Sequence, residues 1–415
     1  MTKVRVGLVG TGLIAQVMHL HYLTELADYF DVAAVCDLDR EGARGCAQRY
    51  GIPAVFTDWR DLLTQPLDAV MVLTSGSHAP IAEAAARAGR HVFVEKPMCF
   101  SAAEGQAMVA AAETAGVVLM VGYPKRYDPA FARMREETAR LDGARLLRVT
   151  TFESPLRPYV GHYPLLPRAP LPAEVAAALR QDSDERIRAA VGPAASELER
   201  QVYEMVLLDT LVHELNTVRG LLGEPTRLEF ASLALDHVTV MLRFGDLPVA
   251  IHWIDLPSIA RYAMEFALYA PDRRLRLTFP SPFLRNEPAM LEIESGAGGT
   301  SRSWRTEEVI GYESGFKNEL VAFQDSIVTG QPPSTSGRDG LRDVILCQAI
   351  VDSHHRSAPV DHPTGTDAGA AGRDAGAAGR DARAAGTDAR AAGTDAGAGV
   401  TDAGAGGTDK GGRSG

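Results

Sequence analysis

A glycine-rich loop near the start of the chain has the residue types and the spacing that bind a diphosphate. Gly10, Gly12 and Ala15 form the pattern G-x-G-x-x-A within VGLVGTGLIA. The first glycine permits a tight turn, the second lets the backbone approach the diphosphate, and Ala15 lets the following helix pack closely on the strand. Backbone N–H groups and the helix dipole then attract the anion. The residues predicted to form this anion site are Gly10, Thr11, Gly12, Leu13 and Ile14.

An acidic residue follows at the distance expected for a nucleotide ribose. Asp37 ends the apolar run DVAAVCD and lies 22 residues beyond Ala15. A carboxylate at this position accepts hydrogen bonds from the ribose hydroxyls and repels a 2′-phosphate, so the pattern favours NAD over NADP. Arg40, three residues further on, would weaken that preference. The simpler alternative is a glycine turn beside an unrelated surface aspartate.

The run HVFVEKP (91–97) places a lysine at the carboxyl end of a predicted buried strand. This is the edge of a parallel sheet at which ligands bind. Partial burial would leave the ammonium of Lys96 poorly solvated and able to donate a hydrogen bond to a substrate carbonyl or alkoxide. On position alone, a loop lysine paired with Glu95 explains the pattern equally well.

A helical segment further along the chain carries a possible acid–base pair. In LLDTLVHELNTVRGLLGEP, Asp209, His213 and Asn216 fall on one side of a helix, beside an apolar stripe. An aspartate one turn before a histidine orients the imidazole and makes it more basic, which suits proton transfer near neutral pH. A solvated i,i+4 contact is the alternative. Because no further ligand stands at metal spacing, we expect no metal site.

The elements that must position these residues follow an alternating pattern in the first 123 residues. Short apolar runs alternate with helical segments, which is typical of a doubly wound parallel sheet, the Rossmann class of α/β folds. One such helix, predicted over 101–114, begins with Ser101 as N-cap and Glu104 completing a capping box. The predicted strands lie in 4–10, 31–37, 68–74, 91–97 and 116–122, and a further helix is predicted over 80–88.

The pattern changes after residue 123 and predicts a second, α+β domain over 124–360. Strands of mixed periodicity between 228 and 295 indicate an open, antiparallel or mixed sheet of five or six strands, with one face available to a partner. A proline-rich and helical insertion occupies 155–200. Helices are predicted over 129–141, 173–190, 194–222, 314–329 and 337–355, and a strand is predicted over 145–153.

The last part of the chain, 361–415, repeats an aspartate every seven residues. The repeat contains mostly alanine and glycine between its aspartates, so it offers no apolar seam for a coiled coil. We predict that this tail is disordered. The repeating aspartates are Asp367, Asp374, Asp381, Asp388, Asp395, Asp402 and Asp409.

Composition excludes several classes of protein. The net charge of −11 argues against nucleic acid or an anionic membrane as the main partner. The four cysteines are scattered, which predicts neither disulfides nor a cysteine zinc site. No run of 18 apolar residues predicts a membrane span, and the N-terminus does not resemble a signal peptide. A cytoplasmic location is therefore expected.

Four segments together resemble a known family. The glycine loop, HVFVEKP, VGYPKRYDP (121–129) and DTLVHELN (209–216) stand in the order typical of the glucose-fructose oxidoreductase / inositol dehydrogenase / rhizopine catabolism family, abbreviated Gfo/Idh/MocA. The resemblance covers most of residues 3–355 and is strongest in the first 130. It implies an NAD(P)-dependent oxidoreductase with a Rossmann domain and an α+β domain, whose open sheet often forms an oligomer interface.

The resemblance also implies roles for individual residues. Lys96 would contact both the substrate hydroxyl and the nicotinamide, His213 would transfer the proton, and Asp209 would bind substrate. Glu95 and Pro97 flank the lysine. The implied cofactor contacts beyond the glycine loop are Asp37, Thr74, Ser75, His78, Glu95, Lys96, Pro97 and Arg126. The implied substrate contacts are Lys96, Tyr123, Arg126, Asp209 and His213.

These features predict reversible hydride transfer between NAD(H) and a secondary hydroxyl of a sugar, ketosugar or cyclitol, by a homodimer or homotetramer. Two departures from the family pattern bear on the substrate pocket. The segment before Asp209, Tyr203-Glu-Met-Val-Leu-Leu, lacks the usual glycines, and the insertion 155–200 is unusually long. The alternatives are a non-catalytic NAD-sensing regulator on the same fold and a glycoside hydrolase that uses tightly held NAD.

Overall fold

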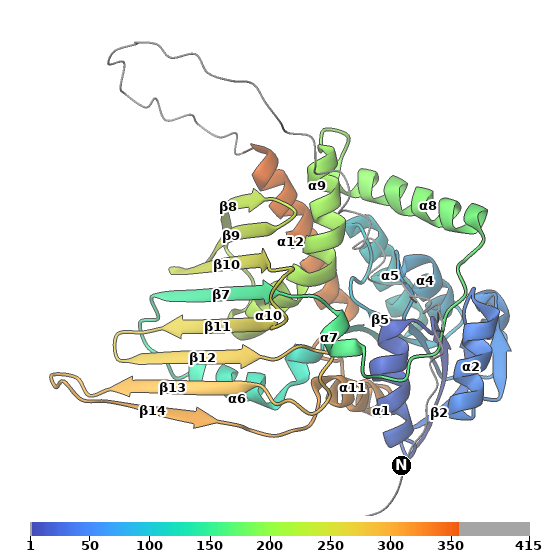
Figure 1. The fold of residues 1–415 in the computed structure, drawn as a ribbon, viewed down its shortest axis with the longest axis horizontal. Helices are drawn as coiled ribbons and strands as arrows, with labels where there is room; N and C mark the ends of the chain where they lie inside the picture. The colour runs from blue at the N-terminus through green and yellow to red at the C-terminus, as the bar shows by residue number, and fades with distance from the viewer. Residues whose placement is uncertain (1, 357–415) are drawn as a thin grey trace, which may run out of the picture.

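The computed structural model describes residues 2–356, which form two sheets with their helices (Figure 1). The first sheet has the strand order β3-β2-β1-β4-β5-β6, and all of its pairs are parallel. This is the doubly wound Rossmann order. Its strands are β1 Val4–Val9, β2 Phe30–Cys36, β3 Ala54–Phe56, β4 Ala69–Val72, β5 His91–Glu95 and β6 Leu119–Gly122.

Helices connect these strands as crossovers. The connecting helices are the π-helical turn η1 (Ala15–His19) with α1 (Leu20–Glu25), α2 (Arg40–Tyr50), α3 (Trp59–Leu63), α4 (Ala79–Arg87) and α5 (Ala102–Ala115). At the start of α5, Ser101 accepts a hydrogen bond from the N–H of Glu104, and the Glu104 side chain accepts one from the N–H of Ser101. The predicted capping box is therefore confirmed.

The second sheet is mixed and has eight strands in the order β14-β13-β12-β11-β7-β10-β9-β8. Strand β7 is parallel to β10, and the other neighbours are antiparallel. Its strands are β7 Leu146–Glu153, β8 Arg227–Leu233, β9 His237–Phe244, β10 Leu247–Asp255, β11 Ala263–Tyr269, β12 Arg273–Phe279, β13 Met290–Gly296 and β14 Ser303–Glu308.

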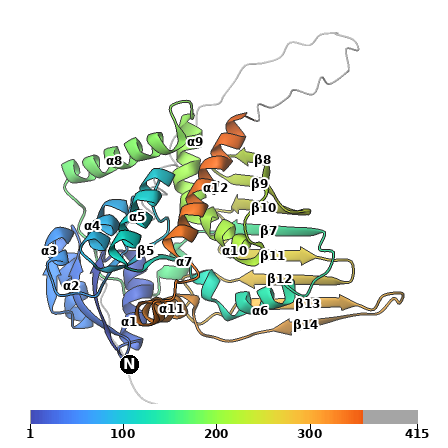
Figure 2. The same ribbon diagram turned by 180° about the vertical axis from the view of Figure 1, so that it is seen from behind.

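Helices lie on one face of this second sheet, and the opposite face carries none of the described helices (Figures 1 and 2). Along β7, Leu147, Val149 and Thr151 are buried toward the helices, while Arg148 is exposed on the open face. The remaining helices are η2 Pro124–Tyr127, α6 Pro129–Thr138, α7 Arg157–Val160, α8 Ala173–Val191, α9 Glu197–Val202, η3 Tyr203–Leu211, α10 Val212–Leu222, α11 Gly315–Thr329 and α12 Gly337–Arg356.

The two C-terminal helices return to the first sheet. From α11, Phe316, Leu320 and Phe323 enter the same apolar core as the strands β1 and β4. Phe323 meets Phe93 of β5 with ring centroids 5.6 Å apart. Next to β6, the backbone and hydroxyl of Thr335 are hydrogen-bonded to Val121. The C-terminal part of the chain thus completes the core of the N-terminal sheet.

The predicted fold class is confirmed, and the differences are local. The short strand β3 and the edge strand β14 were not predicted, because each has few residues to show a pattern and β14 is largely exposed. The run 228–295 holds six strands of the second sheet, β8 to β13, as expected, and β7 and β14 bring the sheet to eight. The predicted domain boundary at 123/124 stays a prediction, and the predicted disordered tail lies outside the described residues. No helix among residues 2–356 is long and apolar enough to cross a membrane.

Candidate functional site

The glycine loop takes a backbone path that a side chain would obstruct at its first glycine. Gly10 has φ +102°, and a Cβ there would lie 2.7 Å from the carbonyl carbon of Leu73, so a side chain is excluded. A Cβ on Gly12 would approach only the guanidinium of Arg168, at 3.0 Å. The loop therefore fits the diphosphate of a dinucleotide, which needs close approach to this backbone. Leu13 and Ile14 are half-buried at the start of the helix that follows.

Asp37 is held beside this loop at the carboxyl end of β2. Its Oδ2 accepts hydrogen bonds from the Thr11 N–H at 2.7 Å and the Thr11 hydroxyl at 2.9 Å. Its Oδ1 accepts from the Asp39 N–H at 2.9 Å and from the guanidinium of Arg168 at 3.0 Å. The carboxylate is thus next to the anion site, where a ribose carboxylate is expected, but the contact with Arg168 was not predicted.

The loop after β4 is joined to the end of β5 by a buried histidine. The two ring nitrogens of His78 lie 2.7 Å from the carbonyl oxygen of Thr74 and 2.8 Å from that of Pro97. Burial lowers the pKa of His78, so the neutral ring donates to one of these carbonyls. This contact holds both loops at the carboxyl edge of the sheet. Thr74 is half-buried and Ser75 is exposed at that edge.

Lys96 and Asp209 meet directly. The Nζ of Lys96 donates to Oδ1 of Asp209 at 2.8 Å and to its backbone carbonyl oxygen at 2.5 Å. Burial would lower the pKa of Lys96, but the negative charge of Asp209 and its hydrogen bond raise the pKa above its usual value. The lysine is therefore a fixed cation at the carboxyl end of β5. Its partner is Asp209, whereas Glu95 was the partner in the alternative interpretation.

His213 lies near this cation, but it does not have the partner expected from the sequence. Its Nδ1 is buried without a hydrogen-bond partner among the described residues, and its ring meets the edge of Tyr123 at 6.0 Å. Burial, followed by the charges of Lys125 and Lys96, holds the pKa of His213 well below its usual value. The expectation that Asp209 orients His213 and makes it more basic is wrong, because Asp209 contacts Lys96 instead.

Local helix geometry accounts for this difference. Asp209 lies in the π-helical segment η3 and His213 follows in α10, so the spacing of a regular α-helix does not apply across them. Asn216 does not join them either. Its side-chain amide donates to Asp339 at 2.9 Å and to Asp343 at 2.7 Å, both in α12. The predicted polar stripe is therefore divided. Asp209 contacts Lys96, whereas Asn216 contacts α12.

Arg126 belongs to the network on the α12 side. Its guanidinium donates to the backbone oxygen of Asn216 at 3.2 Å and lies 3.5 Å from a carboxylate oxygen of Asp339. Arg219 donates to Asp343 at 2.5 Å in the same network. These contacts hold η2 against α10 and α12. The predicted contact of Arg126 with cofactor or substrate stays a prediction.

Three ionisable residues near Lys96 were not predicted from the sequence. Burial lowers the pKa of Lys125 to about 8, against the opposing effect of Glu214. Burial raises the pKa of Glu214 to about 7, and its carboxylate accepts a hydrogen bond from the Thr151 hydroxyl. Burial also raises the pKa of Glu153. Lys125 lies between the predicted residues Tyr123 and Arg126 in VGYPKRYDP, so the motif could have indicated it. Its burial could not be predicted from the sequence.

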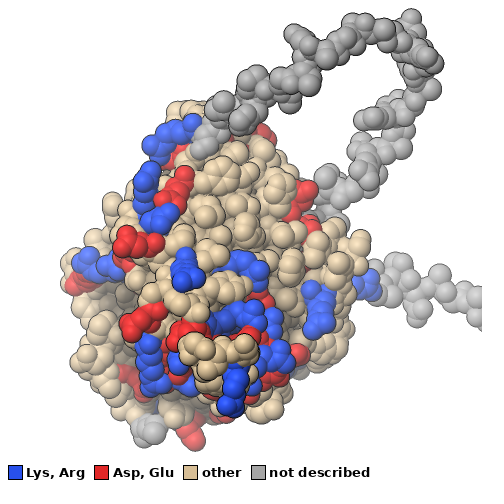
Figure 3. Space-filling model, turned by 90° about the vertical axis from the view of Figure 1, so that its left-hand side faces the viewer, with Lys and Arg blue, Asp and Glu red and all other residues tan. Residues whose placement is uncertain are grey.

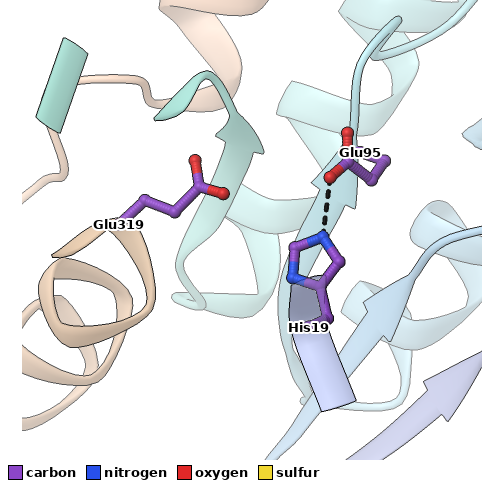
Figure 4. Close-up of side chains that lie close together, drawn as sticks. All are labelled: His19, Glu95 and Glu319. Atoms are coloured by element: carbon purple, nitrogen blue, oxygen red, sulfur yellow. Dashed lines mark hydrogen bonds and ion pairs between the residues drawn. The ribbon is translucent and has the colours of Figure 1, made fainter. Parts of the chain in front are cut away.

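A buried acid–imidazole cluster supports the end of β5 (Figure 4). His19 Nε2 lies 2.6 Å from Glu95 Oε1, and Glu95 Oε2 accepts a hydrogen bond from the Lys96 N–H at 3.0 Å. Although burial opposes it, the hydrogen bond from His19 lowers the pKa of Glu95. Glu319 of α11 points toward this pair, and its carboxylate has no hydrogen-bond partner among the described residues.

The three side chains of this cluster also have the donor types of a metal site. One ligand atom from each of His19, Glu95 and Glu319 lies within 4.8 Å of the others. The direct hydrogen bond between His19 and Glu95 already occupies Nε2 of His19 and Oε1 of Glu95, which are possible metal-ligand atoms. Burial, followed by the charge of Glu95, raises the pKa of Glu319 well above its usual value, which favours the neutral form of this acid. A neutral carboxyl group is a poor cation ligand, and the expectation of no metal site stays a prediction.

Comparison with known proteins supports the fold and identifies the family. Residues 4–123 match the model of an oxidoreductase family with an NAD-binding Rossmann fold, the Gfo/Idh/MocA family. D-apiose dehydrogenase of Paraburkholderia graminis is 38% identical over 374 residues, which cover 85% of this chain and 88% of that protein. Myo-inositol 2-dehydrogenase of Thermotoga maritima is 24% identical over 361 residues, covering 84% of this chain and 96% of that protein.

Solved structures share the fold. Levoglucosan dehydrogenase in complex with NADH has a TM-score of 0.65 at 20% identity, covering 85% of this chain and 97% of that one. Because a relative at 38% identity spans most of both chains and the family model matches the N-terminal sheet, the assignment does not depend on the fold alone. The chain belongs to the Gfo/Idh/MocA family of oxidoreductases with an NAD-binding Rossmann fold, and it is an NAD(P)-dependent dehydrogenase.

Proposed function

We propose that this protein transfers a hydride reversibly between NAD(H) and a secondary hydroxyl or ketone of a sugar, ketosugar or cyclitol. The observation that carries the proposal is the fixed Lys96 ammonium near a neutral histidine at the carboxyl edge of the Rossmann sheet. The substrate class is supported by the names of the relatives, which are dehydrogenases of D-apiose, myo-inositol and levoglucosan.

The glycine loop and Asp37 would hold the dinucleotide. Bound NAD would supply the carbon that accepts or returns the hydride. Close, aligned positioning of the substrate carbon over that ring accounts for much of the rate in such reactions. Thr74 and Ser75 stand at the same edge, where we infer that they contact the cofactor.

Residues of this chain would stabilise the charge that develops on the substrate oxygen and would transfer its proton. The Lys96 ammonium donates to the substrate oxygen and stabilises the negative charge that develops there. His213 is neutral at neutral pH, so its imidazole can take the hydroxyl proton during oxidation and return it during reduction. Asp209 holds the lysine and a neighbouring substrate hydroxyl. Lys125, with its pKa lowered to about 8, is a second candidate for binding substrate oxygen.

We propose NAD as the preferred cofactor. Asp37 is buried and acidic at the ribose position, and a 2′-phosphate there would be repelled. Arg40 is exposed at the start of α2, and Arg168 is paired with Asp37, so both arginines reduce this repulsion. Comparison of kcat/KM for NAD and NADP tests the preference.

The experiment that tests the function is a substrate survey with the purified protein. Formation of NADH is followed by its absorbance, with pentoses, hexoses, anhydrosugars and inositols as substrates. We expect reduction of NAD with at least one class. Clear binding of NAD without turnover of any class favours a sensing protein, and release of sugar from an aryl glycoside without net NADH favours a hydrolase.

We also propose that the protein assembles as a homodimer or homotetramer through the open face of its second sheet, and that its domains divide at 123/124. Among residues 2–356 no helix covers the open face, and Phe152 and Phe230 are 38% and 43% exposed on it. It also carries ion pairs such as Arg148–Glu265 and Arg276–Glu292. Figure 3 views the left-hand side of Figure 1, toward which the strands of the second sheet run, and acidic and basic side chains are intermixed there. An interface between copies typically has an apolar core surrounded by a polar rim.

A further inference from the structure

The extended part of the insertion lies across the carboxyl edge of the Rossmann sheet. We call residues 161–172 the strap; it runs from α7 past α1 and α2 to α8 (Figure 1). The Leu166 N–H donates to the Gln16 side chain at 2.8 Å, and the Ala169 N–H donates to Asp39 at 2.9 Å. Arg49 of α2 donates to the carbonyl oxygen of Pro164 at 2.6 Å. The strap is therefore attached to the elements that flank the glycine loop.

Arg168 extends from the strap into the dinucleotide site. Its Nη2 lies 3.0 Å from Asp37 Oδ1, and its Nη1 lies 3.0 Å from the position that a Cβ of Gly12 would occupy. The side chain of Arg168 is 20% exposed. The guanidinium thus stands between the carboxylate expected to bind the ribose and the glycine expected to approach the diphosphate.

The chemistry of this position suits a phosphate oxygen. A guanidinium presents several N–H donors in one plane, so it can keep its bond to Asp37 and donate to a phosphate at the same time. Its positive charge would also reduce the repulsion between the diphosphate and the carboxylates of Asp37 and Asp39. A partly buried guanidinium strengthens such a bond, because less water competes for its donors.

The other end of the insertion flanks the same edge. Arg186 of α8 donates to Glu104 at 2.6 Å, and the Ser183 hydroxyl lies 3.8 Å from the position of a Cβ on Gly76, in the loop after β4. The insertion therefore reaches the carboxyl edge of the sheet at two places. The strap reaches the end of β2, and α8 reaches the loop after β4.

We propose that the strap is a cofactor-binding element, and that Arg168 donates to the diphosphate of the bound dinucleotide. The inference rests on the proposed binding of NAD at the glycine loop. It adds to that site a contact from the second half of the chain. One consequence is that the cofactor lies partly beneath the strap, which slows its release.

The test compares Arg168→Ala and Arg168→Lys with Arg180→Ala, an exposed arginine of α8 in the same insertion. Binding of NAD, NADP and ADP is measured by titration calorimetry without substrate. For Arg168→Ala we expect binding of all three ligands to weaken by about tenfold or more, since the lost contact is a charge-assisted hydrogen bond. Arg168→Lys keeps the charge but not the planar donors and should fall between, while Arg180→Ala should bind like the unaltered protein.

Several outcomes would overturn the inference. Unchanged binding of NAD and ADP to Arg168→Ala would show that Arg168 only holds the strap. Weaker binding of NADP alone would assign Arg168 to the 2′-phosphate instead of the diphosphate. Arg168→Lys provides the test if the alanine variant does not fold. If the unaltered protein binds NAD but oxidises no substrate, the proposed reaction fails while the binding comparison still decides the role of Arg168.

Discussion

At the residue scale, the site depends on charged side chains that change the pKa values of their neighbours. Lys96 is held as a cation by Asp209, and the two nearby ammonium groups of Lys96 and Lys125, together with burial, keep His213 neutral. A fixed cation beside a neutral imidazole is the combination that oxidation of an alcohol needs, because one group stabilises the oxygen while the other takes the proton.

The role of Lys96 gives the first prediction. Lys96→Ala removes the donor to the substrate oxygen but leaves the glycine loop and Asp37 intact. We expect kcat to fall by at least about a hundredfold, in line with the loss of one donor to a developing oxyanion. The dissociation constant of NAD, measured by calorimetry, should change little. Near-normal turnover would contradict the role, and Lys3→Ala at the exposed N-terminus is the control.

Glu319 gives a prediction for the dependence of stability on pH. Burial raises the pKa of this carboxyl group, so the folded protein retains a proton that the unfolded chain loses above its ordinary pKa. The contribution of Glu319 to stability is therefore present at low pH and falls as the pH rises toward the folded-state pKa. Glu319→Gln stays neutral at every pH. Its stability relative to the unaltered protein should increase from pH 5 to pH 8.

Thermal or urea unfolding at several pH values measures this difference. The slope should approach about 1.4 kcal/mol per pH unit between the two pKa values, which is the limit for one proton. A difference between the two proteins that does not depend on pH would show that Glu319 is ionised in the folded state. Glu313→Gln, at an exposed carboxylate just before α11, is the control.

At the element scale, the return of α11 to the first sheet is the main feature that periodicity did not predict. The helix itself was predicted over 314–329 and is observed at Gly315–Thr329. Its apolar side indicated burial, but the pattern could not say against which sheet, because any apolar surface satisfies the same side chains. In the structure Phe323 meets Phe93 of β5.

A core substitution tests this packing. Phe323→Ala should lower the free energy of unfolding by about 3–5 kcal/mol, the usual range for a buried phenylalanine. Val328→Ala, at a position of the same helix that is 52% exposed, should change it by less than about 0.5 kcal/mol. Urea unfolding of the three proteins measures both effects. Equal, small effects would mean that α11 does not complete the Rossmann core.

At the scale of the whole molecule, the open face of the second sheet is the surface available for self-association. We predict a dimer or tetramer in size-exclusion chromatography with light scattering. Phe230→Glu places a charge on this face of β8 and should shift the protein toward monomer. Leu179→Glu, on the exposed side of α8, should leave the mass unchanged. A monomer at all concentrations would contradict the proposal.

The sequence by itself determined the local parts of this protein. Apart from the short strand β3, the order of strands to residue 123, the capping box at Ser101 and the turn at Gly10 follow from side-chain periodicity, hydrogen-bonding groups and backbone freedom, which act over a few residues. The residues of the glycine loop, Asp37 and Lys96 could be predicted for the same reason, since each stands at a strand end.

Only the tertiary structure decided which of these residues meet. Asp209 contacts Lys96 and not its helical neighbour His213, because a π-helical segment and the opposing strand end determine where its carboxylate lies. Arg168 reaches Asp37 across 131 positions of the chain. Contacts of this kind, like the burial that lowers the pKa of Lys125, depend on how separate elements pack, and no local pattern in the sequence records them.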